Sequence, residues 1–305
     1  MILKKFKQAS YFITFKLKSI LSRKFRNPLL AGIKITTKCN MQCIHCPFWR
    51  QSSDFNMQWE VFKKSVEELY RKGVRILIIE GGEPMLWDDI VHKKTINDAI
   101  DYAKKYFFYT AVTTNGSLDF NDINPDIVFI SIESAKENYS KIRGDHFETV
   151  LENIKKSKGK KIIINVTINS ITFEDVVYTI KFLNEFVYGF TFQFFYPYEG
   201  LGDFKISSQQ RKEIMEDIIE LKRKGFKILD SYDALKRMSD NSWVCNDFLV
   251  SSVEVDGKIN NGCYLKDRTV KISCRDCGFF AHCELSLAFQ LNPGALLTAK
   301  KIFMD

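Results

Sequence analysis

The stretch GIKITTKCNMQCIHCPFW, residues 32–49, places an apolar strand directly before three closely spaced cysteines. Cys39, Cys43 and Cys46 follow the spacing C-x3-C-x2-C, with His45 between the last two. Four thiolates complete a structural zinc site or fully ligate a four-iron cluster, whereas three leave one metal position open. Because a catalytic metal site needs such an open position, we interpret this stretch as the start of an active site.

The chain that follows alternates short apolar runs with helical patterns. Strands are predicted at 31–36, 74–80, 107–113, 127–133, 161–168 and 190–195, and helices at 58–72, 89–105, 145–157, 172–186 and 207–224. Only the link from 113 to 127 lacks a convincing helix. Strands this apolar are buried on both faces, so the pattern predicts a parallel sheet of six β-α units. The expected α/β fold is a partial (β/α)6 TIM-like barrel, with function at the carboxyl ends of its strands.

The character of the sequence changes after about residue 230. FLVSSVEVDGKINNGCY predicts a β-hairpin that turns at Asp256-Gly257, with Cys245 before the hairpin and Cys263 at its end. The run CRDCGFFAHC then carries three more cysteines, and the chain ends in a predicted helix, 285–302, interrupted by Pro293. We therefore predict three parts: an amphipathic helix at 1–28, the barrel at 29–230, and a cysteine-rich extension at 231–305.

Eight cysteines in 305 residues fall into two tight groups, which indicates metal or redox sites in a reducing compartment. The C-terminal group is Cys245, Cys263, Cys274, Cys277 and Cys283. The sequence has no apolar run of about 18 residues and no secretory signal pattern. We expect a cytoplasmic protein.

The net charge of +8 lies at one end of the chain. Residues 1–26 hold eight Lys and Arg and no acidic residue, so the remainder is balanced. Apolar residues recur there at helical spacing, and a basic amphipathic helix is typical of peripheral membrane contact. The alternative is a helix that packs its apolar stripe on the body of the protein. We do not expect nucleic acid as a partner, because the body carries no excess of basic residues.

The C-x3-C-x2-C motif after the first strand resembles the radical S-adenosylmethionine (SAM) enzymes, and the resemblance covers residues 31 to about 230. It implies a [4Fe–4S] cluster on Cys39, Cys43 and Cys46 whose open iron binds SAM. Reduction of the cluster, by an external donor of the ferredoxin or flavodoxin type, then cleaves SAM to a 5′-deoxyadenosyl radical that abstracts hydrogen from a substrate. The resemblance assigns no catalytic side chain.

The same resemblance implies which residues contact SAM. EGGEP (residues 80–84) would bind the amino group, TTNG (113–116) ends the third strand as in many relatives, and Arg143 would pair with the carboxylate. In SIES, Ser131 and Glu133 would hydrogen-bond the ribose, and His45 would stack near the adenine. The implied SAM-binding residues are Gly81, Gly82, Glu83, Asn115, Ser131, Glu133, Arg143 and Asn165. Solvated strand ends, a surface arginine and packing roles remain the alternatives.

The C-terminal cysteines resemble the twitch extension, a shortened SPASM domain that holds auxiliary [4Fe–4S] clusters. Because Leu287 stands where full SPASM has a further cysteine, the resemblance implies one auxiliary cluster. Cys263, Cys274 and Cys277 are its expected ligands, and either Cys245 or Cys283 is the fourth. A structural zinc ion suits four cysteines equally well.

Two main substrate hypotheses follow from the sequence. One hypothesis is a lipid or isoprenoid met at a membrane, because of the basic helix and because GCYLKDR…CRDCGFFAHC weakly resembles adenosylhopane synthase. A second is maturation of a peptide or protein side chain, although only about 30 residues precede the first strand, which is short for a peptide-recognition domain. RNA modification and a non-enzymatic, metal-stabilised membrane adaptor are weaker alternatives.

Overall fold

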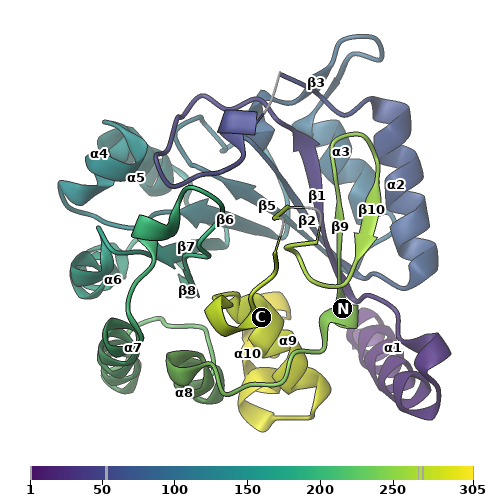
Figure 1. The fold of residues 1–305 in the computed structure, drawn as a ribbon. Helices are drawn as coiled ribbons and strands as arrows, with labels where there is room; N and C mark the ends of the chain where they lie inside the picture. Colours follow the sequence, from purple (N-terminus) through teal and green to yellow (C-terminus); the bar gives the residue numbers. More distant parts are fainter. Residues whose placement is uncertain (1, 52–53, 267, 270, 305) are drawn as a thin grey trace.

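The computed structural model describes residues 2–51, 54–266, 268–269 and 271–304, and an eight-stranded sheet lies at its centre (Figure 1). Six parallel strands neighbour one another in chain order: β1 (Leu30–Thr36), β2 (Ile76–Gly81), β5 (Tyr109–Thr114), β6 (Ile127–Ser131), β7 (Ile162–Ile168) and β8 (Gly189–Phe194). These are the six strands expected from the apolar runs. The predicted partial barrel is confirmed.

Helices connect these strands and cover the outer face of the sheet (Figure 1). They are α2 (Trp59–Lys72), α3 (Ile96–Lys104), α4 (Asn138–Arg143), α5 (Phe147–Lys156), α6 (Val176–Leu183) and α7 (Ser208–Arg223). The helix predicted at 89–105 begins only at Ile96, because the residues before it form a small hairpin of β3 (Asp88–Asp89) and β4 (Lys94–Thr95). Asp98 accepts a hydrogen bond from the Thr95 N–H at 3.0 Å and so caps the helix there.

The C-terminal segment adds two strands to the same sheet. β9 (Val250–Val253) and β10 (Ile259–Asn261) form the predicted hairpin, and Gly257 takes a positive φ of 87° at its turn. β9 also pairs in parallel with β1, so the hairpin extends the barrel sheet. Sequence patterns missed this pairing because it joins segments far apart in the chain. The domain boundaries at residues 28 and 230 stay predictions.

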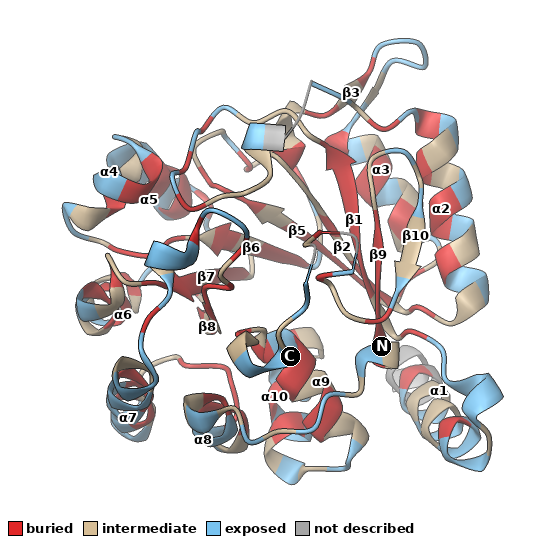
Figure 2. Ribbon diagram, in the orientation of Figure 1, coloured by how far each residue is buried: buried red, intermediate tan, exposed pale blue. Residues whose placement is uncertain are grey.

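Three further helices complete the C-terminal segment: α8 (Tyr232–Asp240), α9 (Phe280–Phe289) and α10 (Pro293–Phe303). α9 and α10 lie between β8 and β9, where the barrel is open (Figure 1). Phe280 packs against Phe192 and Phe194 on β8, with ring centroids 6.4 and 5.8 Å away. Figure 2 shows buried residues along the strands and on helix faces turned toward them. Pro293 starts α10 at a position where a proline ring is tolerated.

Helix α1 (Ile2–Leu21) packs at the amino ends of the first strands. The Tyr11 hydroxyl donates to the Gly73 carbonyl at 2.5 Å, and its ring meets Phe108 edge-on at 5.5 Å. None of the helices in the described ranges is both long and apolar enough to cross a membrane.

Candidate active site at the barrel mouth

The three N-terminal cysteines line one cavity of about 450 Å³ inside the barrel. Their loop follows β1 and is held against the end of β2 by two backbone hydrogen bonds. The Gly82 N–H donates to Thr36 O at 2.8 Å, and the Glu83 N–H donates to Lys38 O at 2.7 Å. A Cβ atom on Gly82 would lie 2.2 Å from Lys38 O, so only glycine allows the cysteine loop to lie this close.

Glu83 is completely buried and ties β2 to β5. The Thr114 hydroxyl and the Met85 N–H donate to its Oε1 at 2.7 and 3.1 Å, and the Asn115 N–H donates to Oε2 at 2.7 Å. Burial raises the pKa of Glu83, and these donors oppose that rise. The carboxylate therefore stands behind the cavity wall and fixes the strand ends; contact with a SAM amino group stays a prediction.

Arg143 and Glu133 form a buried bidentate ion pair beneath the cysteine loop. Arg143 Nη2 donates to Glu133 Oε1 at 2.6 Å, its Nε donates to Oε2, and its Nη1 lies 3.7 Å from Cys43 Sγ. Burial favours a raised pKa for Glu133, but the Arg143 charge outweighs it, and the net pKa is lowered. A positive charge thus sits beside one predicted cluster ligand.

His45 lies in the same corner of the site. Its Nε2 is 3.7 Å from Glu133 Oε1, its buried Nδ1 finds no partner among the described residues, and its ring meets Phe195 edge-on at 6.0 Å. Burial lowers the pKa of His45 to about 4, so its ring is neutral at pH 7. A neutral ring with a free nitrogen at a cavity wall can stack on a ligand or accept one hydrogen bond from it.

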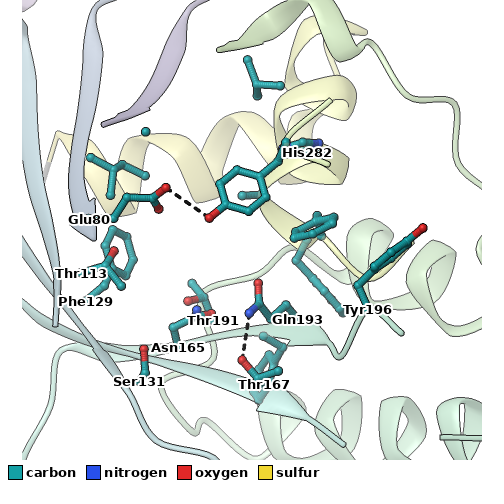
Figure 3. A pocket seen from close by; sticks show the side chains of 18 of the residues that line it. Glu80, Thr113, Phe129, Ser131, Asn165, Thr167, Thr191, Gln193, Tyr196 and His282 are labelled. Carbon is teal, nitrogen blue, oxygen red and sulfur yellow. Dashed lines mark hydrogen bonds between the residues drawn. The ribbon is translucent and has the colours of Figure 1, made fainter. Parts of the chain in front are cut away.

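Polar side chains on neighbouring strands face the cavity farther along the barrel (Figure 3). Ser131, Asn165 and Thr191 are direct cross-strand partners on β6, β7 and β8. Within the described part of the chain, the side chains of Ser131 and Asn165 make no hydrogen bond to protein, which leaves them available to a ligand. Two residues farther along β7 and β8, the Gln193 side-chain amide donates to the Thr167 hydroxyl at 2.8 Å.

The structure brings six of the eight predicted SAM-binding residues to the cavity wall: Gly81, Gly82, Asn115, Ser131, Arg143 and Asn165. Glu83 and Glu133 lie fully buried behind that wall. The side chain of Asn115 is already engaged, because it donates to Asn40 Oδ1 at 2.9 Å. Each of these SAM-binding roles stays a prediction.

A buried charge network closes the C-terminal segment over the cavity, and the sequence analysis missed it. Lys34 and Glu80 are cross-strand partners on β1 and β2, and Lys34 Nζ lies 3.0 Å from Glu254 Oε2. Arg268 Nη2 lies 2.7 Å from Glu254 Oε1, while its Nη1 lies 3.6 Å from Glu80 Oε1. Tyr264 donates to Glu80 Oε1 at 3.2 Å (Figure 3). Glu80 opens the EGGEP motif, and strand alternation alone could have placed it in the barrel.

A second missed pair lies toward the base of the cavity, where Asp230 and Glu284 line the wall near α9. The Phe192 N–H donates to Asp230 at 2.9 Å, and the Ser231 N–H donates to Glu284. Burial raises the pKa of Asp230, and it raises the pKa of Glu284 to about 7. No local sequence motif predicts this pair, because the two residues come together only in the folded chain.

The five C-terminal cysteines separate into two environments. Cys245 and Cys274 are exposed and Cys263 and Cys277 are half-buried, whereas Cys283 is fully buried in the apolar core. Burial raises the pKa of Cys245 to about 12, with contributions from Cys277, Cys263 and Cys274, so these four thiols are electrostatic neighbours. Burial is the main cause that raises the pKa of Cys283, and the charges of Glu284 and Asp230 add to the rise, whereas Arg237 opposes it.

Across the described ranges, no three His, Cys, Asp or Glu side chains are already arranged to hold a metal ion, and all eight cysteines are free thiols. The donor chemistry nevertheless fits an iron–sulfur cluster at the barrel mouth. Three thiols line one cavity, a guanidinium lies beside Cys43, and Gly82 allows the close packing of the loop.

Comparison with known proteins finds a matching family model, described as the Radical SAM superfamily, at residues 33–183. Two curated relatives are the subtilosin biosynthesis protein AlbA of Bacillus subtilis and the GTP 3′,8-cyclase of Aliarcobacter butzleri. AlbA is 36% identical over 99 residues, which cover 32% of this chain and 20% of AlbA. The cyclase is 30% identical over 165 residues, which cover 49% of this chain and 50% of the cyclase. The chain thus spans half or less of the length of these relatives.

Among solved structures, Streptococcus suis SuiB bound to S-adenosylmethionine matches with a TM-score of 0.65 and 15% identity. The match covers 87% of this chain and 66% of that one. SuiB bound to its precursor peptide SuiA matches equally well, with a TM-score of 0.65. At this identity the likeness shows a shared fold.

Proposed function

The chain belongs to the radical SAM superfamily, and from this premise we propose that the barrel mouth binds a [4Fe–4S] cluster and SAM and uses them on an organic substrate held in the cavity. A bound cluster would supply the one electron that cleaves SAM to methionine and a 5′-deoxyadenosyl radical, and this radical would take a hydrogen atom from the substrate. A ferredoxin- or flavodoxin-type protein would supply that electron.

The chain's own residues would bind and orient these groups. Cys39, Cys43 and Cys46 would hold three irons, and the Arg143 guanidinium would offset the negative charge of the thiolate at Cys43. Ser131 and Asn165, whose side chains face the cavity and make no hydrogen bond within the described part of the chain, would hydrogen-bond SAM.

The observation that carries this proposal is that three thiols and the Gly81–Gly82 turn meet at one wall of one cavity. The test is anaerobic reconstitution with iron and sulfide, followed by SAM and dithionite. Formation of 5′-deoxyadenosine, and its loss when the three cysteines are changed to alanine, is the expected result. Protein that binds iron through these cysteines but releases no 5′-deoxyadenosine would contradict the proposal.

We further propose that one auxiliary [4Fe–4S] cluster binds Cys245, Cys263, Cys274 and Cys277. Two of these thiols are exposed and two are half-buried, and the charges of the other three act on Cys245, which supports this choice, whereas Cys283 lies in the apolar core. Iron and sulfide analysis of a Cys39/Cys43/Cys46→Ala variant tests it. About four irons per chain should remain; zinc in their place would favour the structural-zinc alternative.

The structure and the comparisons support two substrate classes, a lipid or isoprenoid and a peptide, and one experiment can compare them. The lipid or isoprenoid hypothesis is supported by the apolar base of the cavity, where Leu30, Val250, Ile302 and Phe303 form part of the wall. The peptide hypothesis is supported by the matches to AlbA and to peptide-bound SuiB.

Deuterium transfer separates the two classes. Deuterated lipid and peptide fractions from cells grown in heavy water would be incubated separately with the reconstituted enzyme, SAM and dithionite. Deuterium in 5′-deoxyadenosine from only one fraction identifies the class, because the abstracted atom ends on that product.

A further inference from the structure

Over residues 8–21, whose side chains the structure describes, helix α1 has two apolar faces, and the body of the protein covers one of them. On the covered face, Phe12 meets Phe108 with ring centroids 6.1 Å apart, and Phe15 meets Phe289 at 6.5 Å. The buried Gln8 accepts a hydrogen bond from the Tyr109 hydroxyl at 2.9 Å. These contacts attach α1 to the barrel.

The opposite face carries large apolar side chains in solvent. Ile13, Leu17, Ile20 and Leu21 are 62, 55, 62 and 82% exposed, and their spacing places them along one side of the helix. Phe25, just past the helix, is 50% exposed. Scattered exposed apolar residues are ordinary, but five gathered within residues 13–25 form an unpartnered surface.

Basic side chains accompany this surface. Lys18, Arg23 and Lys24 are exposed at the end of α1 and just after it, and no acidic side chain in the described ranges forms an ion pair with them. Residues 1–26 contain no acidic residue, while the remaining chain is electrically balanced. A partner for this surface must therefore offer both an apolar interior and negative charge.

A second exposed apolar group lies at the same end of the molecule. Leu291, just before α10, and Leu296 and Leu297, within α10, are 61, 45 and 66% exposed. α1 reaches the end of α9 directly, because Lys16 Nζ lies 3.7 Å above the ring of Phe289. Figure 2 shows α1 and the α9–α10 turn at one end of the fold, away from β3.

We propose that Ile13, Leu17, Ile20, Leu21 and Phe25, together with the basic residues beside them, form a basic-apolar face that docks on an anionic phospholipid bilayer. The apolar side chains would enter the headgroup region while lysine and arginine meet lipid phosphates. A second copy of this chain fits less well, because two such faces would bring like charges together. This proposal does not rest on the reaction proposed above.

The test is flotation of the full chain with vesicles of phosphatidylcholine alone or with about 30% phosphatidylglycerol. Binding should require the anionic lipid and weaken in high salt, because the attraction is screened. Ile13→Ser/Leu17→Ser/Ile20→Ser and Arg23→Glu/Lys24→Glu should each weaken binding at least about tenfold.

Two matched variants control for composition. Ile90→Ser/Val91→Ser removes side chains that are 81 and 86% exposed on the β3–β4 turn, and Arg223→Glu/Lys224→Glu makes the same charge change at the end of α7. Both should bind vesicles like the wild type. Circular dichroism confirms that every variant folds. Absent binding, binding equally weakened by the controls, or a dimer abolished by the α1 changes without vesicle binding would overturn the proposal.

Discussion

The two cysteine groups of this chain differ in how firmly the surrounding fold positions them. The first lies on one loop, packed against a glycine turn and backed by the buried Arg143–Glu133 pair. The second gathers from three separate stretches of the C-terminal segment, with two of its thiols exposed. A site that must leave a metal position open needs its ligands positioned by the scaffold, whereas a fully ligated cluster can itself order the loops that bind it.

The largest expected effect comes from removing the first group. Changing Cys39, Cys43 and Cys46 to alanine should abolish 5′-deoxyadenosine formation, because no other thiols line the cavity among the described residues. Product assay by liquid chromatography checks this, and a Cys245→Ser variant serves as the comparison. If the comparison variant lost its SAM cleavage just as completely, the distinct roles of the two groups would be wrong.

Gly82→Ala tests the packing behind the first group. The new Cβ would lie 2.2 Å from Lys38 O, so the cysteine loop must move. We expect SAM cleavage to fall about 100-fold, since small misplacements of reacting groups cost that much. Gly202→Ala, where a Cβ meets nothing within 4 Å, is the matched control. Equal rates for both variants would show that the close approach is not required.

Arg143→Met tests the buried ion pair. Loss of one partner should lower the free energy of unfolding by about 3–5 kcal/mol, because it leaves Glu133 charged and buried. The folded-state pKa of Glu133 is lowered, so this stabilisation is present above the ordinary pKa of Glu and is lost as the pH falls through the lowered value. Urea denaturation of both proteins as a function of pH should show the difference shrinking in acid; a constant difference would argue for a packing effect.

Cys245→Ser and Cys283→Ser should show that Cys245 is a cluster ligand and that Cys283 is a core residue. The first should lower the iron content by about four atoms per chain with little change in the stability of the cluster-free protein. The second variant should keep its iron, but its free energy of unfolding should fall by about 1–3 kcal/mol, because a hydroxyl replaces a thiol in an apolar core. Metal analysis and denaturation curves measure both. The reverse pattern would assign Cys283 as the ligand.

The smallest effect is expected at Glu284, next to Cys283. Burial raises its folded-state pKa to about 7, so folding favours the protonated form and the free energy of unfolding should decline from about pH 4.5 to 7. Glu284→Gln cannot titrate and should show a flatter decline. Denaturation at pH 5 and pH 7.5 checks the slope, and an unchanged slope would assign the pH dependence to Asp230.

Local sequence determined the elements that repeat or cluster along the chain. Apolar runs and helical periodicity give the six strands and most helices, because both patterns are set by near neighbours. The first cysteine loop and the Gly81–Gly82 turn are likewise visible as short motifs, so their meeting at the strand ends follows from the rule for parallel sheets. The late start of α3 was missed because turn residues 88–95 also fit a helical pattern.

Only the tertiary structure decided which distant segments meet. Three sets of contacts join residues that are far apart in the chain: β9 with β1, Arg268 with Glu80 and Glu254, and Asp230 with Glu284. No periodic signal in the sequence records such pairings. The same holds for α1: its sequence shows an amphipathic, basic helix, but which apolar side chains are covered depends on where Phe108 and Phe289 lie in the folded protein. Periodicity reports what a segment can bury, and packing decides what it does bury.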